Sequence, residues 1–238
     1  MRIIALGDPM KTYIYALAAA ALTATGAQAT TFTTTTAGYA AQGTGGCAIG
    51  CNSQQYTVDG LVLTISAGIY TDTASTGGAV VTPNGNDAEP RIYVTGTGVD
   101  IDAGNGLPND QEDEVDGNNG NEVLIFSFSQ QVSLISALFA AVDSNDGFDL
   151  FIDSNNDGVL ERISQDNDIP GGNLANFAAL NLVGKLFGIG ASGSNDEWKL
   201  AALTVRAVVS DVPLPAALPL FLAGVAGFGF SARRKQRA

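Results

Sequence analysis

The residues best suited to chemistry form a short acidic segment with the sequence DSNNDG. Asp153, Asn155 and Asp157 occupy alternate positions and Gly158 follows, so three side-chain oxygens can converge on one hard cation while the glycine allows a sharp turn. The backbone carbonyl of Val159 can add a further ligand. The spacing therefore predicts a calcium site, and calcium is the one cofactor that the sequence suggests.

This segment departs from an EF-hand loop at its twelfth position, which is Ser164 where a bidentate glutamate is expected. A calcium ion would need another carboxylate, and the candidates are Glu161, Asp143 and Asp146. The competing interpretation is an ordinary hairpin turn, because turns between strands favour Asp, Asn and Gly. A second acidic segment at 107–122, LPNDQEDEVDGNNGNE, allows the same two interpretations.

The composition excludes several classes of site. The chain has no histidine, which removes Ser-His-Asp and Cys-His catalysis and most zinc chemistry. Between Thr30 and Asp211 there are 23 acidic and five basic residues, a net charge of −18. An acidic body repels nucleic-acid phosphates and attracts cations. Carboxylates that a glycosidase would use are abundant, but no pair stands in a recognisable motif, so we expect no enzymatic activity.

The chain has two cysteines, Cys47 and Cys51, in the segment GGCAIGC. Disulfides persist in exported proteins, so we predict a Cys47–Cys51 bond. It would close a very small loop, and its entropic contribution to stability would be modest. The alternative is a pair of free thiols, since two sulfurs without histidine leave zinc short of ligands.

The N-terminal region predicts export. Lys11 precedes an apolar stretch of about ten residues, which is too short to span a bilayer. The AQA triplet ending at Ala29 fits the small-x-small rule for cleavage. We therefore predict a signal peptide over residues 1–29, cut after Ala29, and the pattern favours Met10 as the true start. The alternative is a membrane anchor.

The C-terminal region combines a proline-bearing pentapeptide, an uncharged apolar run and a basic tail. The uncharged run is near the lower length limit for a membrane-spanning helix, which needs ~17–25 residues. By the positive-inside rule, the basic tail stays in the cytoplasm while the body faces outward. The motif consists of Val212, Pro213, Leu214, Pro215 and Ala216. The stop-transfer tail consists of Arg233, Arg234, Lys235 and Arg237.

This order of motif, helix and tail over residues 212–238 resembles the PEP-CTERM class of sorting signals, in its VPLPA variant. The resemblance implies recognition by an exosortase, a membrane protease-transpeptidase-like enzyme that cuts near the motif. It also implies a Gram-negative bacterium that makes exopolysaccharide, biofilm or floc. A permanent single-pass anchor predicts the same topology without a cut.

The body also resembles exported proteins that carry this tail. The similar segments are the acidic DEVDG at 113–117, EVLIFSFS at 122–129 and FDLFID at 148–153. This looser resemblance transfers architecture and no activity.

Strand-like runs dominate the body and would position the acidic loops. They are rich in Val, Ile, Leu, Phe and Thr, and turn residues separate them. The runs are 61–67, 91–96, 122–129, 132–143, 148–153, 158–163, 185–191 and 198–209. The segment 173–184 is the one candidate for a short helix, and 30–46 suggests an edge strand followed by a loop.

Alternation is clear in two of these runs. Phe148, Leu150 and Ile152 share one face of their run, and in 123–129 the odd and even positions separate in the same way. Many short strands at near-regular spacing predict an all-β fold, an antiparallel β-sandwich that is jelly-roll-like. A signal helix and a C-terminal transmembrane helix would flank it.

Three regions follow: 1–29, the signal peptide; 30–211, the acidic exported domain; and 212–238, the sorting signal. We expect a non-enzymatic surface or extracellular-matrix protein, sorted by an exosortase and associated with exopolysaccharide or biofilm. Its location would be transient at the membrane, then cell-surface or extracellular. The alternatives are a calcium-dependent, lectin-like carbohydrate-binding sandwich, a hydrolase, and a precursor that releases a free secreted domain.

Overall fold

The computed structural model describes residues 27–35, 37–38, 43–44, 51–72, 79–83, 91–102, 114–117 and 121–208. The predicted signal peptide up to residue 26, the sorting motif, the basic tail, Cys47 and most of the acidic segment at 107–122 lie outside these residues. Within them, no helix is long and apolar enough to cross a membrane.

The regular structure of the described residues is almost entirely β-strand; the exceptions are two helical residues at 37–38 and the 3₁₀ turn η2 (Ala178–Leu180). Every strand pair in this part of the chain is antiparallel, which confirms the all-β, antiparallel prediction. The strands are β1 (Ala29–Thr33), β2 (Gly43–Thr44), β3 (Ser53–Val58), β4 (Leu61–Asp72), β5 (Ala79–Pro83), β6 (Arg91–Val94), β7 (Val99–Asp102), β8 (Val115–Asp116), β9 (Asn121–Ala140), β10 (Gly147–Ile152), β11 (Glu161–Asp168), β12 (Leu174–Asn176), β13 (Val183–Gly190) and β14 (Glu197–Ala207).

The 20-residue strand β9 organises the sheet because its two halves have different neighbours. Up to Phe128 it lies between β4 and β13. From Val132 onward it lies between β14 on one side and β12 with the start of β13 on the other. The sequence predicts two strands here, at 122–129 and 132–143, and this is wrong. The exposed polar residues at 129–131 interrupt the apolar pattern, but the backbone continues as one strand through them.

The predicted alternation along β9 and β10 is confirmed. Leu124, Phe126 and Phe128 belong to the main core, together with the Phe148, Leu150 and Ile152 face of β10. The opposite faces carry a second, smaller cluster, which consists of Tyr70, Val123, Ile125, Phe151 and Leu160 with Leu186 packed against it. β10 is therefore buried on both faces.

Trp198 lies in the main core at the start of β14. Its indole Nε1–H donates to the backbone oxygen of Gly147 at 3.1 Å. The Phe139 ring stands edge-on to Trp198 and stacks on Phe148. These aromatic contacts fix the β9–β10 turn against β14, because aromatic pairs prefer such edge and stacked arrangements.

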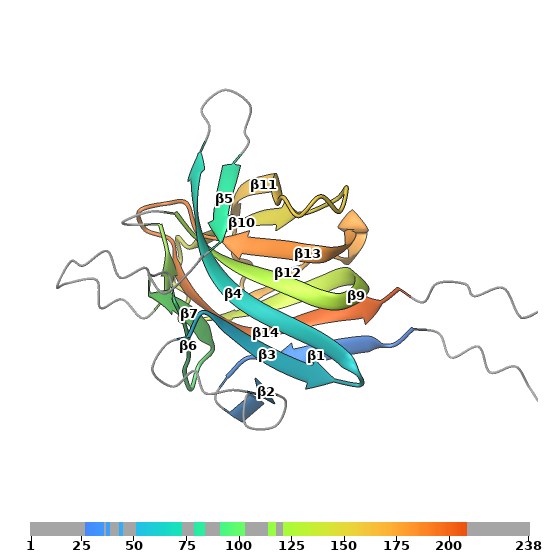
Figure 1. The fold of residues 1–238 in the computed structure, drawn as a ribbon. Helices are drawn as coiled ribbons and strands as arrows, with labels where there is room; N and C mark the ends of the chain where they lie inside the picture. Colours follow the sequence, from blue (N-terminus) through green and yellow to red (C-terminus); the bar gives the residue numbers. More distant parts are fainter. Residues whose placement is uncertain are drawn as a thin grey trace, which may run out of the picture.

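The two ends of the described domain lie together. β1 pairs with β14, and the register joins Ala29 to Arg206 and Thr33 to Ala202. Phe32 of β1 is fully buried in the main core, which ties this strand to the domain. Figure 1 shows the start of β1 and the end of β14 at the same side of the molecule.

The short helix suggested at 173–184 is wrong. That segment forms β12, the single turn η2 and the beginning of β13. Ala175 and Phe177 are buried while Leu174 and Asn176 are exposed, which is the two-residue period of a strand. Asn181 takes a left-handed conformation with φ of 51° and ends the turn, as Asn at such a position often does.

One other predicted strand needs correction. The run at 158–163 begins with a bend, and its strand starts at Glu161, because Gly158 has a φ of 87° that a strand does not allow. The edge strand expected within 30–46 is confirmed as β1. β2, β3, β5, β7, β8 and β12 were not predicted, since they are short and polar or lie next to turn residues.

Candidate functional site

The loop between β10 and β11 carries the residues that the sequence assigns to calcium. Asp153 begins it and accepts hydrogen bonds from two backbone N–H groups, those of Asp157 at 3.1 Å and Gly158 at 2.9 Å. Asp157 in turn accepts the Val159 N–H at 2.8 Å. These bonds close the turn locally, in the way that Asx side chains stabilise turns.

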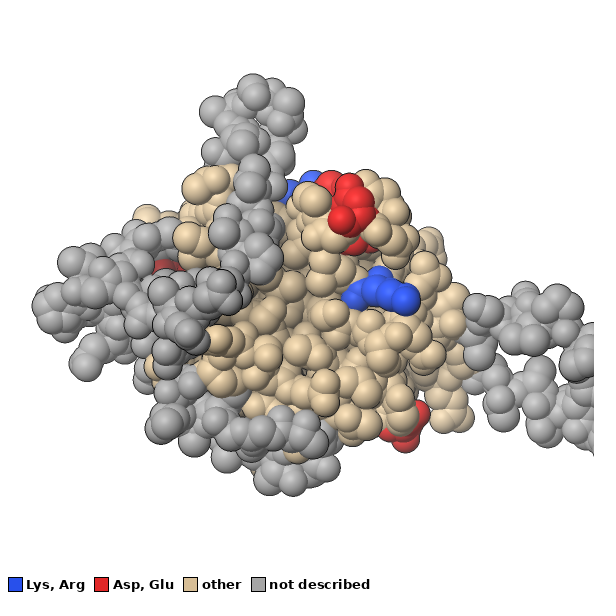
Figure 2. Space-filling model, in the orientation of Figure 1, with Lys and Arg blue, Asp and Glu red and all other residues tan. Residues whose placement is uncertain are grey.

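The other two predicted ligands join the same cluster. Asn155 donates from Nδ2 to Asp157 Oδ2 at 3.0 Å and to Glu161 Oε1 at 3.3 Å. Glu161 Oε2 accepts the backbone N–H of Ser154 at 3.3 Å. The structure therefore brings Asp153, Asn155, Asp157 and Glu161 together, with the exposed side chain of Val159 beside them. Figure 2 shows acidic side chains gathered over this end of the β10–β11 hairpin.

These contacts are those of a closed hairpin turn, and calcium binding here stays a prediction. Among the described residues, no group of three or more His, Cys, Asp or Glu side chains is arranged to hold a metal ion. Asp143 and Asp146, the other carboxylates considered for this site, take part in a separate cluster at the β9–β10 turn.

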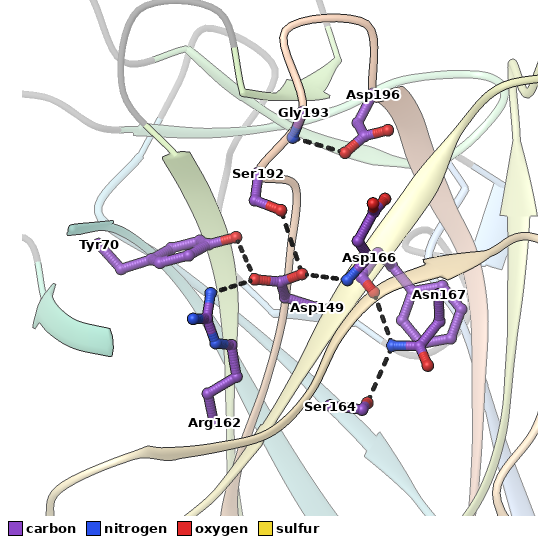
Figure 3. A network of polar contacts seen from close by, with 10 residues as sticks. Tyr70, Asp149, Arg162, Ser164, Asp166, Asn167, Ser192, Gly193 and Asp196 are labelled. Atoms are coloured by element: carbon purple, nitrogen blue, oxygen red, sulfur yellow. Dashed lines mark hydrogen bonds and ion pairs between the residues drawn. The ribbon is translucent and has the colours of Figure 1, made fainter. Parts of the chain in front are cut away.

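Asp149 lies at the centre of a buried polar network that the sequence did not predict (Figure 3). Its Oδ2 accepts the Tyr70 hydroxyl at 3.0 Å and the Arg162 Nη1–H at 2.9 Å. Its Oδ1 accepts the Asp166 N–H at 2.7 Å and the Ser192 hydroxyl at 3.2 Å. Each oxygen receives two donors, which fills the four acceptor positions of a carboxylate.

The Asp149–Arg162 ion pair is buried, with side-chain exposures of 0% and 3%. Removing two charges from water is costly, and the cost is offset only when geometry is good and the remaining lone pairs are bonded. Here the surrounding donors meet that condition. With every acceptor position used, the carboxylate joins β4, β10, β11 and the loop after β13, and it has no acceptor position left for a substrate.

Gly190 of β13 makes room for the tyrosine of this network. A Cβ at this position would lie 2.7 Å from Tyr70 Cε1 and 2.6 Å from the backbone oxygen of Glu122. The Tyr70 ring also meets Phe151 edge-on, with centroids 4.9 Å apart. The ring thus reaches from β4 across the face of β13 to the carboxylate on β10.

A second acidic cluster lies where the β9–β10 turn meets the loop before β14. Asp196 accepts the N–H groups of Gly147 at 2.9 Å and Gly193 at 2.6 Å. Asp146 accepts those of Asp143 at 2.6 Å and Glu197 at 3.2 Å. Burial raises the pKa of Asp146 above its ordinary value, and the neighbouring Asp143 and Asp196 charges add to this, although the two backbone bonds oppose it.

A small pocket of about 170 Å³ opens between β10–β11 and the β12–η2 segment. Phe148, Leu150 and Phe177 line its apolar side, and Asn167 and Asp168 line its polar side. Asn167 is held by its Nδ2, which donates to Phe148 O and to Ser164 Oγ, both at 2.9 Å. An apolar concavity with a few fixed polar groups is the usual form of a small-molecule site.

The remaining predicted residues are placed only in part. Cys51 is disulfide-bonded, and Cys47, the other cysteine of the chain, lies outside the described residues. Of the acidic segment at 107–122, the described part includes β8, in which Asp116 donates its N–H to Glu122 Oε2 at 3.0 Å.

The partners of Asp149 come from three separate segments, β4, β11 and the loop after β13, and only Arg162 stands out in the sequence. It is the single basic residue among sixteen acidic ones between Asp100 and Asp168. A lone cation in such a stretch is a natural partner for a buried carboxylate. Nothing in the sequence marks Tyr70 and Ser192 as partners of Asp149, because only the fold brings them close to it.

Comparison of the chain with models of known protein families, with curated proteins and with solved structures found no match.

Proposed function

We propose that this chain is a non-enzymatic, exported surface or extracellular-matrix protein. Its C-terminal helix holds it at the membrane until an exosortase-type enzyme cuts near Val212–Ala216, after which it associates with exopolysaccharide outside the cell. The observation that carries the proposal is the pairing of Ala29 with Arg206. It brings the end of the predicted signal peptide and the last strand before the predicted sorting signal to one end of the domain.

This arrangement suits a body that is tethered at both ends during export. Val208 is the last described residue, and the motif begins four residues later. Four extended residues span at most about 14 Å, so the folded domain would sit close to the membrane that holds the helix. The turn that contains Asp143 and Asp146 lies at the opposite end of β14, since Ala140 pairs with Lys199 there. That turn would point away from the membrane.

The proposal includes the finer class of the fold, an antiparallel β-sandwich that is jelly-roll-like. The two halves of β9 pair with different strands, yet Phe126 from one half and Phe139 from the other belong to the same core. A long strand whose halves pair with different neighbours around one core supports an arrangement of two packed layers. The predicted signal helix and transmembrane helix belong to the same proposal.

The buried clusters support a structural role for the body. Asp149, Asp153 and Asp196 all have their carboxylates bonded to donors within the fold. Carboxylates used in this way stabilise turns and strand pairs. They do not form the open acid and base pair that hydrolysis requires.

Mass spectrometry of the C-terminus of the protein recovered from cell surface and medium tests the proposal. We expect a mature form that has lost Arg233–Arg237, and a full-length form in cells that lack the processing enzyme. Replacing Pro213 and Pro215 by Ala should block the cut. Pro219→Ala, in the same tail but outside the motif, should not. A mature protein that keeps its basic tail would overturn the sorting proposal.

The pocket beside β11 favours a second candidate, calcium-dependent carbohydrate binding. At about 170 Å³ it is smaller than sites for drug-sized ligands, so it would take a single sugar residue. Binding of the protein to an exopolysaccharide array, with and without millimolar calcium, tests this. Phe177→Ala and Asp168→Ala should abolish binding, and the distant Asp59→Ala should not. If the protein bound nothing on the array, carbohydrate binding would be ruled out and the first function would remain the only proposal.

A further inference from the structure

Lys199 and Asp100 form a second buried ion pair, far from the Asp149 network. Lys199 Nζ lies 2.9 Å from Asp100 Oδ2, and the side chains are 10% and 0% exposed. The two residues are 99 positions apart in the sequence. Neither belongs to a predicted site, and the chain has only five basic residues between Thr30 and Asp211.

The strand register holds the two side chains opposite each other. Leu200 of β14 pairs with Val99 of β7, and both are fully buried in the main core. Because the strands are antiparallel, the next position on each is Lys199 and Asp100. Successive side chains of a strand point to opposite faces, so this pair shares the face away from the core. Two rigid strands therefore keep the amine and the carboxyl in contact.

Burial changes the chemistry of such a pair. Loss of water disfavours the charged form of both a carboxylate and an ammonium. Transfer of one proton across the 2.9 Å contact converts the ion pair into a neutral amine and a neutral carboxylic acid. A neutral lysine amine is a nucleophile, and a carboxylic acid is a better electrophile than its anion.

We propose that Lys199 and Asp100 form an intramolecular amide bond. The neutral Nζ attacks Cγ of the Asp100 carboxylic acid, so that a C–N bond forms and a C–O bond breaks. The departing hydroxyl takes one of the two amine protons and leaves as one water molecule, and the other proton stays on the amide nitrogen. The reaction is a condensation without change of oxidation state, and it needs no reagent beyond the two side chains.

The fold holds the two reacting groups in contact, whereas in water they would have to meet by diffusion. Two groups held in contact react as if their concentration were very high, with effective molarities that reach about 10⁵–10⁸ M in well-oriented cases. The product amide carries no charge, so it replaces a buried ion pair by a neutral group in the same place. The bond would tie β7 to β14 and enclose every strand from β8 to β13 in one covalent loop. This inference does not rest on the proposed sorting of the chain.

A tryptic map of the full chain, reduced and denatured before digestion, tests the proposal. Without the bond, trypsin releases three separate peptides: Ile92–Arg162, Leu186–Lys199 and Leu200–Arg206. With it, Lys199 is blocked. The map should then contain one branched species that joins Ile92–Arg162 to Leu186–Arg206 and is lighter than their sum by one water. Cleavage after the exposed Lys185 shows that digestion is complete.

Lys199→Arg is the matched control. A guanidinium keeps the positive charge but stays protonated, so it can retain the ion pair and cannot attack the acid. In this variant trypsin should cut after position 199, and the branched species should vanish. If the wild-type chain instead yields only free Leu186–Lys199 and Leu200–Arg206, the amide does not form and the proposal is wrong. That result depends on the wild-type protein alone, whether or not the variant folds.

Discussion

At the scale of single residues, Asp149 should be the most sensitive polar position described. It is fully buried and accepts four hydrogen bonds, one of them from a buried guanidinium. Asp149→Ala leaves the Arg162 charge without its partner, so we expect the free energy of unfolding to fall by about 3–5 kcal/mol. Urea denaturation measures this. Asp157→Ala, in the exposed loop, serves as the control and should cost about 1 kcal/mol or less.

Equal losses for Asp149→Ala and Asp157→Ala would contradict the central position given to Asp149. A loss confined to Asp149→Ala would support the view that its network connects strands, since the loop bonds of Asp157 close only a local turn.

The stability that Asp146 contributes to the folded protein changes with pH in the direction opposite to that of most carboxylates. Its pKa is raised in the folded protein, so between 3.8 and that raised value the folded state holds more protons than the unfolded state. Stability from this group is therefore present at low pH and is lost as pH rises through the folded pKa. We expect the wild type to gain stability relative to Asp146→Asn as the pH falls from 7 towards 4.

Thermal unfolding of the two proteins across that pH range measures the difference. A difference that stayed constant with pH, or grew towards neutral pH, would show that the Asp146 carboxyl is not held near its neutral form. Comparing the two proteins at each pH cancels the contributions of the other acidic residues.

At the scale of elements, the backbone of β13 at Gly190 lies so close to Glu122 and Tyr70 that only glycine fits there. A side chain at Gly190 would meet the backbone of Glu122 and the ring of Tyr70 well inside contact distance. We expect Gly190→Ala to destabilise the protein by roughly 1–3 kcal/mol through overpacking. At Gly184, on the same strand, the nearest atoms are 3.4 Å away, so Gly184→Ala should cost less.

Differential scanning calorimetry of the two variants separates these cases. If Gly184→Ala destabilised the protein more than Gly190→Ala, the packing of Tyr70 over β13 would not be what requires glycine in that strand. In Gly190→Ala we also expect the Tyr70–Asp149 hydrogen bond to lengthen.

Features that depend on neighbouring residues can be predicted from the sequence, whereas features that depend on contacts between distant segments cannot. Phe148, Leu150 and Ile152 alternate strictly with polar or second-core residues, so local periodicity alone places them in the main core. The polar residues at 129–131 misled the same analysis, because β9 is paired on both sides of them, up to Phe128 and again from Val132, and runs through them as one strand. At 173–184, apolar residues at helical spacing hid a strand whose exposed Leu174 faces Leu138 of β9.

The residues of the candidate site differ in the same respect: some are neighbours in one loop, and others come from distant segments. Asp153, Asn155, Asp157 and Glu161 lie within one loop, and their spacing alone gathers them. The ring of partners around Asp149 joins segments up to 79 residues apart, and only tertiary packing determines which ones meet.

At the scale of the whole molecule, the position of β14 determines where the chain can be cut. β14 pairs with β9 along one edge and with β1, β7 and β8 along the other. A chain ending at Asp211 keeps the whole strand and should unfold cooperatively, like the full-length protein. A chain ending at Trp198 loses the partner of β1 and the buried Leu200, Leu203 and Val205, and we expect it not to fold.

Circular dichroism during heating distinguishes the two truncated chains. A cooperative transition in the shorter chain would mean that the rest of the sheet closes without β14. Failure of the longer one would mean that residues beyond Asp211 stabilise the domain.

The β1–β14 pair also has a mechanical consequence. Its free ends leave from the same side, so a force that draws them apart loads the hydrogen bonds between the strands one after another, starting in the processed chain at Thr30 and Val205. Strands pulled in this direction part at low force, whereas strands pulled lengthwise share the load over all their bonds. A protein stretched between its two ends would yield first at β1, while the strands enclosed between β7 and β14 stayed folded.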